Sequence, residues 1–363
     1  MLSYTSAVTI ALDASPLSLS TGGVGRYTLE LARALASEYP DDQYWLLSDQ
    51  AFPAPQALPP NLHTGDGPHT PAERKWWLYG LDREMRRRGA TLFHGTDFSV
   101  PYLPLRPTVM TLHDLSPWLD PAWHADASRV RRRTPRLLRM GLATMVITPT
   151  EAIRRAAIER FHLAPDRVVS VPLAAGELFR PVMPALSDVP YFLFVGTREP
   201  RKNIARLLEA WREVRRTLPI DLVLAGRTRA DFPAVPQECG LRVLGEVLDS
   251  ELPPLYSGAA ACVYPSLYEG FGLPVLEAMQ CGALVITSRD PAIVEVSQGA
   301  AVHVDAYDTR SIVDAMRAVA AAPQQFAGIR QKAIARAAQF SWRNTARHTR
   351  EVYDTAARIF SHA

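Results

Sequence analysis

The stretch YPSLYEGFGLPVLEAMQCGALVITS, from Tyr264 to Ser288, links two strand-like runs through a glycine-containing turn and a helix-like segment. The run ACVYPS (261–266) predicts a buried strand, and LPVLEAMQCG (273–282) predicts a helix with proline in its first turn and glycine at its end. The run ALVITS (283–288) predicts the next strand. A strand, a helix and another strand in this order indicate a parallel sheet covered by helices.

The same alternation of apolar runs and amphipathic segments extends over the whole chain. It restarts after RPVMPALSDVP (180–190), a proline-rich stretch that we expect to be an interdomain linker. The sequence therefore predicts an α/β protein of two doubly wound domains, over 1–182 and 183–340, with a cleft between them. The other strand-like runs are AVTIALDAS (7–15), TLFHGT (91–96), TVMTLHDL (108–115), TMVITPT (144–150), RVVSVPL (167–173), YFLFVGT (191–197), DLVLAGR (221–227) and RVLGEV (242–247).

Composition limits the classes of function. The 363 residues are 47% hydrophobic and 21% charged, and the formal net charge of +3 leaves no bulk basic field for nucleic acid. The three cysteines have no CxxC spacing, so neither a disulfide framework nor a zinc site is indicated. The N-terminal stretch lacks the basic region of a signal peptide, and no apolar run approaches the ~20 residues of a membrane span. We expect a cytoplasmic protein.

Two glutamates, Glu269 and Glu277, flank the Gly-Phe-Gly turn at the end of the strand over 261–266. Free backbone N–H groups at the start of the following helix favour an anion such as a diphosphate. Gly270 and Gly272 let a ligand approach the backbone without a Cβ in the way. The two carboxylates then accept hydrogen bonds from hydroxyls on different parts of one phosphorylated ligand.

The segment EGFGLPVLEAMQCG (269–282) resembles the Glu-x7-Glu signature of the retaining family 4 glycosyltransferases. The resemblance implies the GT-B architecture of two facing Rossmann-like domains, with a terminal helix over 341–363 that crosses back onto the first domain. It places Glu269 at the donor sugar and Glu277 on the nucleotide ribose. It also implies that the backbone of Phe271, Gly272 and Leu273 meets the sugar and the diphosphate.

The segment VGTREPRKN (195–203) places a basic cluster after the first strand of the second domain, which predicts a phosphate clamp. The family has a glycine, a basic residue and a lysine here, so the resemblance assigns Lys202 to the departing diphosphate. Thr197 stands where many members carry arginine, and Arg198 and Arg201 are both candidates for that role. The segment around Val247 resembles the one whose backbone brackets the nucleotide base.

In the first domain, the loop that contains Gly22 and Gly23 opens a helix after the first strand. Alone, a GGVG loop is weak evidence. The family's corresponding loop faces the diphosphate and the acceptor. His113 lies at the end of a strand, where the family commonly has a histidine beside the donor sugar, so we expect it to be catalytic together with Glu269 and Lys202.

Two basic stretches suggest contact with a membrane. The segment RVRRRTPRLLRMGL (129–142) contains six arginines and no acidic residue, and ERKWWLYGLDREMRRR (73–88) pairs Trp76 and Trp77 with a basic end. Such stretches lie on anionic membrane surfaces or remain solvated helix faces. Many relatives glycosylate polyprenyl-diphosphate-linked intermediates at the inner face of the membrane, so a peripheral location and a lipid-linked glycan acceptor are the corresponding expectations.

The expected activity is transfer of a sugar from a nucleotide diphosphate donor, with retention at the anomeric carbon. GDP-mannose is the first expectation for the donor, because the PRKN segment resembles bacterial mannosyltransferases, and UDP-sugars are the alternative. We expect no cofactor and no metal. Three other hypotheses are a glycosidase that uses Glu269 and Glu277 as acid and nucleophile, a nucleotide-sugar epimerase, and a degenerate partner subunit that binds nucleotide without turnover.

Overall fold

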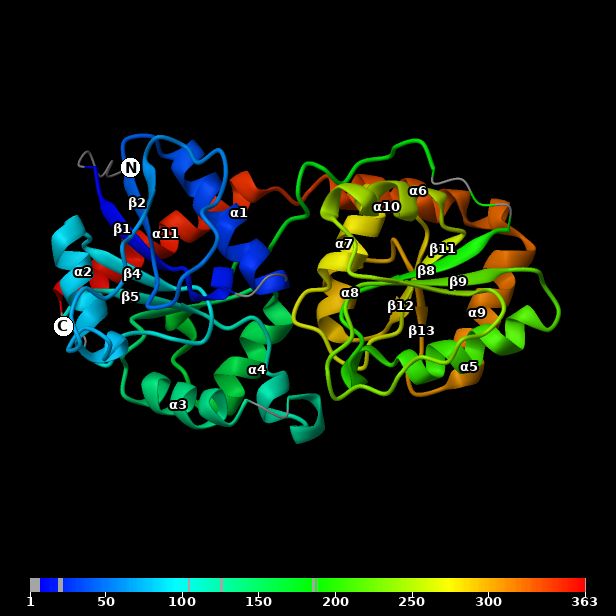
Figure 1. The fold of residues 1–363 in the computed structure, drawn as a ribbon, viewed down its shortest axis with the longest axis horizontal. Coiled ribbons are helices and arrows are strands. Elements are labelled where there is room, and N and C mark those ends of the chain that lie inside the picture. Colours follow the sequence, from blue (N-terminus) through cyan, green and yellow to red (C-terminus); the bar gives the residue numbers. More distant parts are fainter. Residues whose placement is uncertain are drawn as a thin grey trace. The chain divides into compact units, whose positions relative to one another are not determined.

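Two all-parallel sheets organise the chain in the computed structural model, which describes residues 7–18, 22–103, 105–124, 127–184, 187 and 189–362 (Figure 1). Unit 1 comprises the described residues within 1–118, 126–173 and 341–363, and unit 2 those within 119–125 and 174–340. Of the expected linker, residues 185, 186 and 188 lie outside the described residues, as do residues 19–21 of the first glycine-rich segment.

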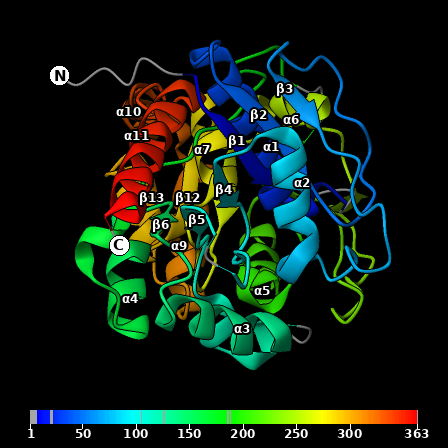
Figure 2. The same cartoon turned by 90° about the vertical axis from the view of Figure 1, so that its left-hand side faces the viewer.

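Unit 1 contains a seven-stranded sheet in the order β3-β2-β1-β4-β5-β6-β7, and every strand pair is parallel (Figure 2). Its strands are β1 (Thr9–Asp13), β2 (Gln43–Leu47), β3 (Leu62–Thr64), β4 (Leu92–Gly95), β5 (Thr108–Thr111), β6 (Met145–Thr148) and β7 (Val168–Ser170). Its helices are α1 (Gly23–Glu38), α2 (Leu81–Arg88), α3 (Ser128–Arg139), α4 (Glu151–Phe161) and α11 (Trp342–Ser361).

Unit 2 contains a six-stranded parallel sheet in the order β10-β9-β8-β11-β12-β13. Its strands are β8 (Tyr191–Val195), β9 (Asp221–Ala225), β10 (Leu241–Gly245), β11 (Ala261–Tyr264), β12 (Val285–Ser288) and β13 (Val302–Val304). Its helices are α5 (Ile204–Arg215), α6 (Leu252–Gly258), α7 (Leu273–Gln280), α8 (Pro291–Ser297), α9 (Thr309–Ala321) and α10 (Ala327–Ala337).

Burial explains why the apolar runs form strands. Every residue of β8, β11 and β12 is buried, as expected for strands covered on both faces by helices. The edge strand β10 differs, because Val243 and Leu244 are 45% and 44% exposed. The chain between β9 and β10 forms turns and irregular structure instead of a covering helix. Because successive residues of a strand point to opposite faces, β10 is accessible on both faces at this point.

The terminal helix α11 is anchored in unit 1 by polar contacts as well as by packing on α1. The buried His94 ring contacts the Tyr353 hydroxyl through Nδ1 at 2.7 Å and the Thr111 hydroxyl through Nε2 at 2.8 Å. Burial lowers the pKa of His94 to about 3, so the ring is neutral at physiological pH. Arg350 of α11 adds an ion pair to Asp42 at 3.0 Å.

Replacing Tyr353 with phenylalanine tests this anchor. The variant leaves Nδ1 of the buried His94 without its partner, and an unsatisfied buried polar atom costs about 1–3 kcal/mol. We expect the free energy of unfolding of unit 1, measured by urea titration, to fall by that amount. Glu351→Gln on the exposed side of the same helix is the control and leaves it unchanged. Equal stability of Tyr353→Phe and the control would contradict the anchoring role.

The two tryptophans of the 73–88 stretch face the interior, which corrects the expectation that they accompany a membrane-facing basic end. Trp76 is 2% exposed and belongs to the core of unit 1, and Trp77 packs edge-on against Phe93. The arginines of α2 are also engaged locally. Arg87 and Arg88 both form ion pairs with the buried Glu84.

Candidate functional site

The loops after β8 and β11 meet at the carboxyl edge of the unit 2 sheet. The backbone N–H of Leu267 donates to the carbonyl of Arg201 at 2.9 Å. The Asn203 amide donates to the carbonyls of Pro265 and Ala306 at 3.1 and 2.7 Å. Asn203 adopts a left-handed conformation, with φ of 61°, between the 3₁₀ turn Pro200–Lys202 and helix α5. These bonds hold the basic segment against the glycine-containing turn.

Glu269 lies between two cations. Lys202 Nζ is 2.6 Å from Glu269 Oε1, and Arg201 Nη1 is 3.1 Å from Oε2. Lys202 also donates to the hydroxyl of Tyr264 at 2.5 Å. All three charged residues are less than one-tenth exposed, at 6% for Glu269, 9% for Arg201 and 8% for Lys202. The structure therefore brings these three predicted site residues into one buried cluster.

The charges in this cluster determine its protonation. Burial alone would raise the pKa of Glu269, but the charges of Lys202 and Arg201 outweigh it and hold the pKa at about 2. Burial lowers the pKa of Lys202, with Arg201 acting in the same direction and Glu269 opposing. Burial also raises the pKa of Tyr264 well above its ordinary value, so its hydroxyl keeps its proton.

The turn at Gly272 requires a glycine. This residue has φ of 88°, and a Cβ there would lie 2.3 Å from Cδ1 of Ile293. Phe271 is buried against Phe340, and Leu273 begins helix α7. Glu277 lies within α7, 2% exposed, and accepts a hydrogen bond from the Tyr256 hydroxyl at 3.0 Å.

Three further residues beside Glu269 were missed by the sequence analysis. The Asp290 carboxylate caps α8 and accepts the backbone N–H of Glu269 at 3.4 Å, and burial raises its pKa to about 6. Trp123 stacks on Tyr268, the neighbour of Glu269, with ring centroids 6.0 Å apart. Only the Asp-Pro pair of residues 290–291 signals a helix start in the sequence. The Trp123–Tyr268 contact has no local signal, since the two residues are far apart in the chain.

Arg198 does not join the Glu269 cluster, although it was predicted beside Arg201 as a candidate for the diphosphate. Its Nε donates to the hydroxyl of Thr228 at 2.7 Å, and its backbone continues the pairing of β8 with β9. The guanidinium lines a pocket under the 228–238 segment. Val247, the predicted neighbour of the nucleotide base, is half-buried just after β10.

In unit 1, Gly22 is the N-cap of α1 and Gly23 is its first residue. His113 follows β5, and its Nε2–H donates to the carbonyl of Thr96 at 2.7 Å while its ring packs edge-on against Tyr27. Burial lowers the pKa of His113, so the imidazole is neutral with Nδ1 as an acceptor.

Two carboxylates that the sequence analysis did not select stand at the ends of β1 and β4. Burial raises the pKa of Asp13 to about 6 and that of Asp97 to about 7, and the Asp13 and Asp114 charges add to the effect on Asp97. Oδ1 of Asp97 has no hydrogen-bond partner among the residues that the structure describes. Within the same residues, no group of three or more His, Cys, Asp or Glu side chains is placed to hold a metal ion.

Two family models match the chain, one over each half. Residues 21–175 match Glycosyltransferase Family 4, and residues 189–322 match Glycosyl transferases group 1. The O-antigen chain mannosyltransferase B of Escherichia coli is 32% identical, with 95% of this chain and 99% of the relative covered. The serotype-specific mannosyltransferase WbdA of Escherichia coli is 29% identical over 66% of this chain. The aligned region covers 32% of that longer protein.

Solved structures share the fold. Sucrose-phosphate synthase from Thermosynechococcus elongatus superposes with a TM-score of 0.76 at 20% identity, covering 98% of this chain and all of the other. Anabaena HepE in complex with UDP and glucose gives a TM-score of 0.71 at 16% identity, covering 96% of this chain and 99% of the other. Two Rossmann-like units with these neighbours define the GT-B fold, which confirms the predicted fold class. The chain belongs to glycosyltransferase family 4, as its motifs predicted, and it is a glycosyltransferase.

The buried cluster predicts a large stability effect for Glu269→Gln. The variant leaves Lys202 and Arg201 without their shared carboxylate, and removing one partner of a buried ion pair costs about 3–5 kcal/mol. Urea unfolding of unit 2 should show a loss of this order. Glu213→Gln is the control, because Glu213 pairs with Arg310 and Arg317 close to the surface, and such pairs contribute less than about 1 kcal/mol. Similar losses for both variants would contradict the assignment.

Proposed function

We propose that this glycosyltransferase transfers mannose from GDP-mannose to a glycan or polyprenyl-diphosphate-linked glycan acceptor, with retention at the anomeric carbon. The observation that carries the proposal is the 32% identity to the O-antigen chain mannosyltransferase B across nearly the whole of both chains. The agreement between the Glu269–Glu277 motif and the buried cluster around Glu269 supports placing the chemistry in unit 2.

Lys202 and Arg201 are the groups that stabilise the departing diphosphate in this proposal. Both are cations held at the carboxyl edge of the sheet, where open parallel sheets bind ligands. A diphosphate oxygen competes with Glu269 for the Lys202 ammonium. Charge that develops on the leaving group therefore finds a cation already in place, which costs no reorganisation during the reaction.

The two glutamates contact different parts of the donor. Glu269, ionised because its pKa is about 2, accepts hydrogen bonds from sugar hydroxyls, and Glu277 accepts from the ribose. The backbone of Phe271, Gly272 and Leu273, at the start of α7, approaches the sugar and diphosphate. In unit 1, neutral His113 receives a sugar hydroxyl hydrogen bond at Nδ1, and Gly22 and Gly23 meet the diphosphate. The acceptor hydroxyl attacks from the face that the diphosphate leaves.

A second candidate is a UDP-sugar-dependent transferase of the same family. It is favoured by one observation, the fold similarity to HepE, which was solved with UDP and glucose. A nucleotide-binding subunit without turnover is the third candidate. No metal takes part in the proposed chemistry, so turnover should be unaffected by EDTA.

Nucleotide binding and transfer are tested together. A thermal-shift panel of GDP, UDP, ADP and dTDP with their sugar conjugates should show stabilisation by GDP and GDP-mannose, because a ligand bound only to the folded state raises the melting temperature. Glu269→Ala should still bind GDP but lose at least about a hundredfold in transfer rate, since it removes a contact to the reacting sugar. Stabilisation by UDP compounds alone would identify the donor as a UDP-sugar instead of GDP-mannose. Undiminished transfer by Glu269→Ala would contradict the site.

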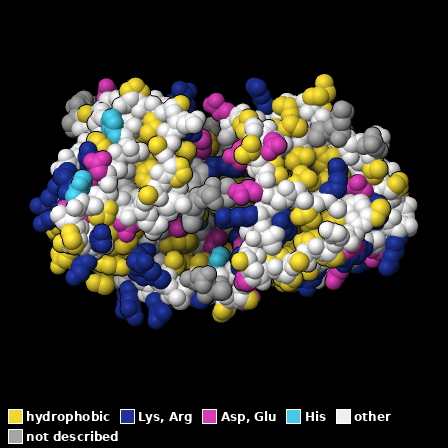
Figure 3. Space-filling view, viewed as in Figure 1, with side chains coloured by type: hydrophobic (Ala, Val, Ile, Leu, Met, Phe, Trp, Pro, Cys, Tyr) yellow, Lys and Arg dark blue, Asp and Glu magenta, His cyan; other side chains and the backbone are white. Residues whose placement is uncertain are grey.

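The arginine-rich helix α3 supports a peripheral membrane location in this proposal. Its inward side chains are Thr134, Leu137 and Leu138, so most of its arginines point outward, and Lys and Arg side chains gather over this part of unit 1 (Figure 3). No helix among the described residues is long and apolar enough to cross a membrane.

A charge-matched pair of variants tests the membrane surface. Arg132→Gln/Arg136→Gln/Arg139→Gln should weaken flotation with anionic liposomes, since each basic residue near such a surface contributes about 1 kcal/mol. The control Arg216→Gln/Arg310→Gln/Arg317→Gln removes the same charge from unit 2 and should float like the wild type. Wild-type protein that shows no preference for anionic over neutral liposomes would contradict membrane binding.

A further inference from the structure

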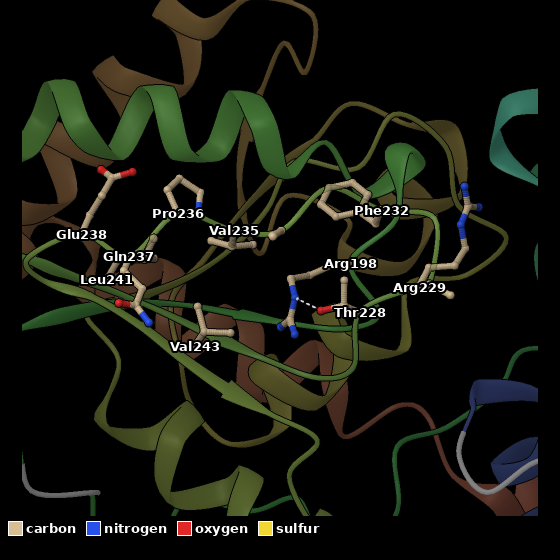
Figure 4. A pocket seen from close by; sticks show the side chains of 12 residues that line it. Arg198, Thr228, Arg229, Phe232, Val235, Pro236, Gln237, Glu238, Leu241 and Val243 are labelled. Carbon is tan, nitrogen blue, oxygen red and sulfur yellow. Dashed lines mark hydrogen bonds between the residues drawn. The ribbon is translucent and has the colours of Figure 1, made fainter.

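The pocket under the 228–238 segment of unit 2 contains a guanidinium with one unpaired nitrogen. The cavity has a volume of about 800 Å³ and lies between the face of β10 that carries Leu241 and Val243 and the irregular chain that precedes the strand (Figure 4). Arg198 lies in its wall and is only 3% exposed. Its Nε is held by Thr228, whereas Nη1 is buried and has no hydrogen-bond partner among the described residues.

The carboxylates near this pocket are already engaged. Glu199 pairs with Arg201 at 2.8 Å, and Glu238 is bound by Arg212 Nε at 2.8 Å. Asp231 accepts from Arg229 at 3.0 Å. Burial lowers the pKa of Arg198, and no carboxylate compensates for it. A buried guanidinium left without acceptors is costly, so a ligand that supplies acceptors gains from binding there.

The walls of the pocket select the kind of ligand. Phe232 and Val235 come from the covering segment, and Leu241 and Val243 come from β10, so apolar side chains form much of the wall around the guanidinium (Figure 4). The polar part of the lining comes from Thr228, Arg229, Gln237 and Glu238. A hydrated anion gains nothing from such walls, whereas a flat heteroaromatic ring does. A guanidinium fork pairs most specifically with the adjacent O6 and N7 acceptors of guanine. Adenine presents an amino donor at the position of O6.

We infer that this pocket holds the base of the donor and that Arg198 selects a 6-oxopurine by donating to its O6 and N7 edge. The inference rests on the proposed nucleotide-sugar function and assigns Arg198 to the base instead of the diphosphate. Arg198 and Lys202 belong to one short loop, so the base and the diphosphate of a single donor meet opposite ends of it. Thr228 positions the guanidinium through its Nε.

The test compares nucleoside diphosphates that differ only in the base. Dissociation constants of GDP, inosine diphosphate, ADP and UDP, and of pyrophosphate, are measured by calorimetry for the full chain and for Arg198→Gln. Wild-type protein should bind GDP and inosine diphosphate more tightly than ADP, since both carry O6 and N7. Arg198→Gln should weaken these two by roughly 5- to 150-fold and leave ADP and pyrophosphate unchanged. Arg227→Gln, an exposed neighbour of the same charge, should match the wild type.

Each other outcome overturns the inference. Equal weakening of every ligand, pyrophosphate included, would place Arg198 on the diphosphate, and no weakening would exclude the pocket as the base site. If Arg198→Gln fails to fold, Thr228→Val gives the same comparison, with a smaller loss confined to GDP and inosine diphosphate. If Arg198→Gln still transfers mannose from GDP-mannose and still prefers GDP to ADP, this inference is refuted and the proposed function is not. Wild-type protein that binds no nucleoside diphosphate would instead refute the proposed function.

Discussion

The ion pair between Lys202 and Glu269 is the contact on which the arrangement of unit 2 depends. It joins the loop after β8 to the loop after β11, with 2.6 Å between Nζ and Oε1, in surroundings that exclude most solvent. Charges buried in this way are expensive to desolvate, and apolar residues of similar volume often stabilise a fold equally well. In the proposed function, this pair holds Lys202 beside a carboxylate, from which the lysine passes to the diphosphate of the donor.

The parallel sheet supplies the positions for this exchange, because all six strands of unit 2 deliver their loops to one edge. Interior strands carry helices on both sides, but β10 is an edge strand without a helix before it. That local gap leaves the pocket in which Arg198 lies. One loop thus presents cations in two different environments, Lys202 among charged groups and Arg198 among apolar ones.

Much of this organisation was predictable from the sequence. The remainder was not predictable, and the reasons can be identified. Buried apolar runs such as 191–195 and 261–264 predict strands directly, and the Glu269–Glu277 motif predicts the loop and helix that follow. The strands β3 and β13 were missed because three residues carry too little pattern, and the five-residue strand β2 was missed as well. Periodicity could not separate Arg201 from Arg198, because Arg201 lies in the 3₁₀ turn Pro200–Lys202 and Arg198 lies before it, so their side chains point in different directions. Contacts between distant segments, such as Trp123 on Tyr268, leave no local trace.

The central claim is that unit 2 binds a nucleotide-activated mannose whose anomeric configuration is retained on transfer. It is tested most directly by incubating the protein with GDP-α-mannose and a mannose-containing glycan acceptor, and by determining the anomeric configuration of the product by NMR. The account predicts an α-mannoside with GDP released in equal amount. A β-linked product, or free mannose without any transfer product, would contradict it.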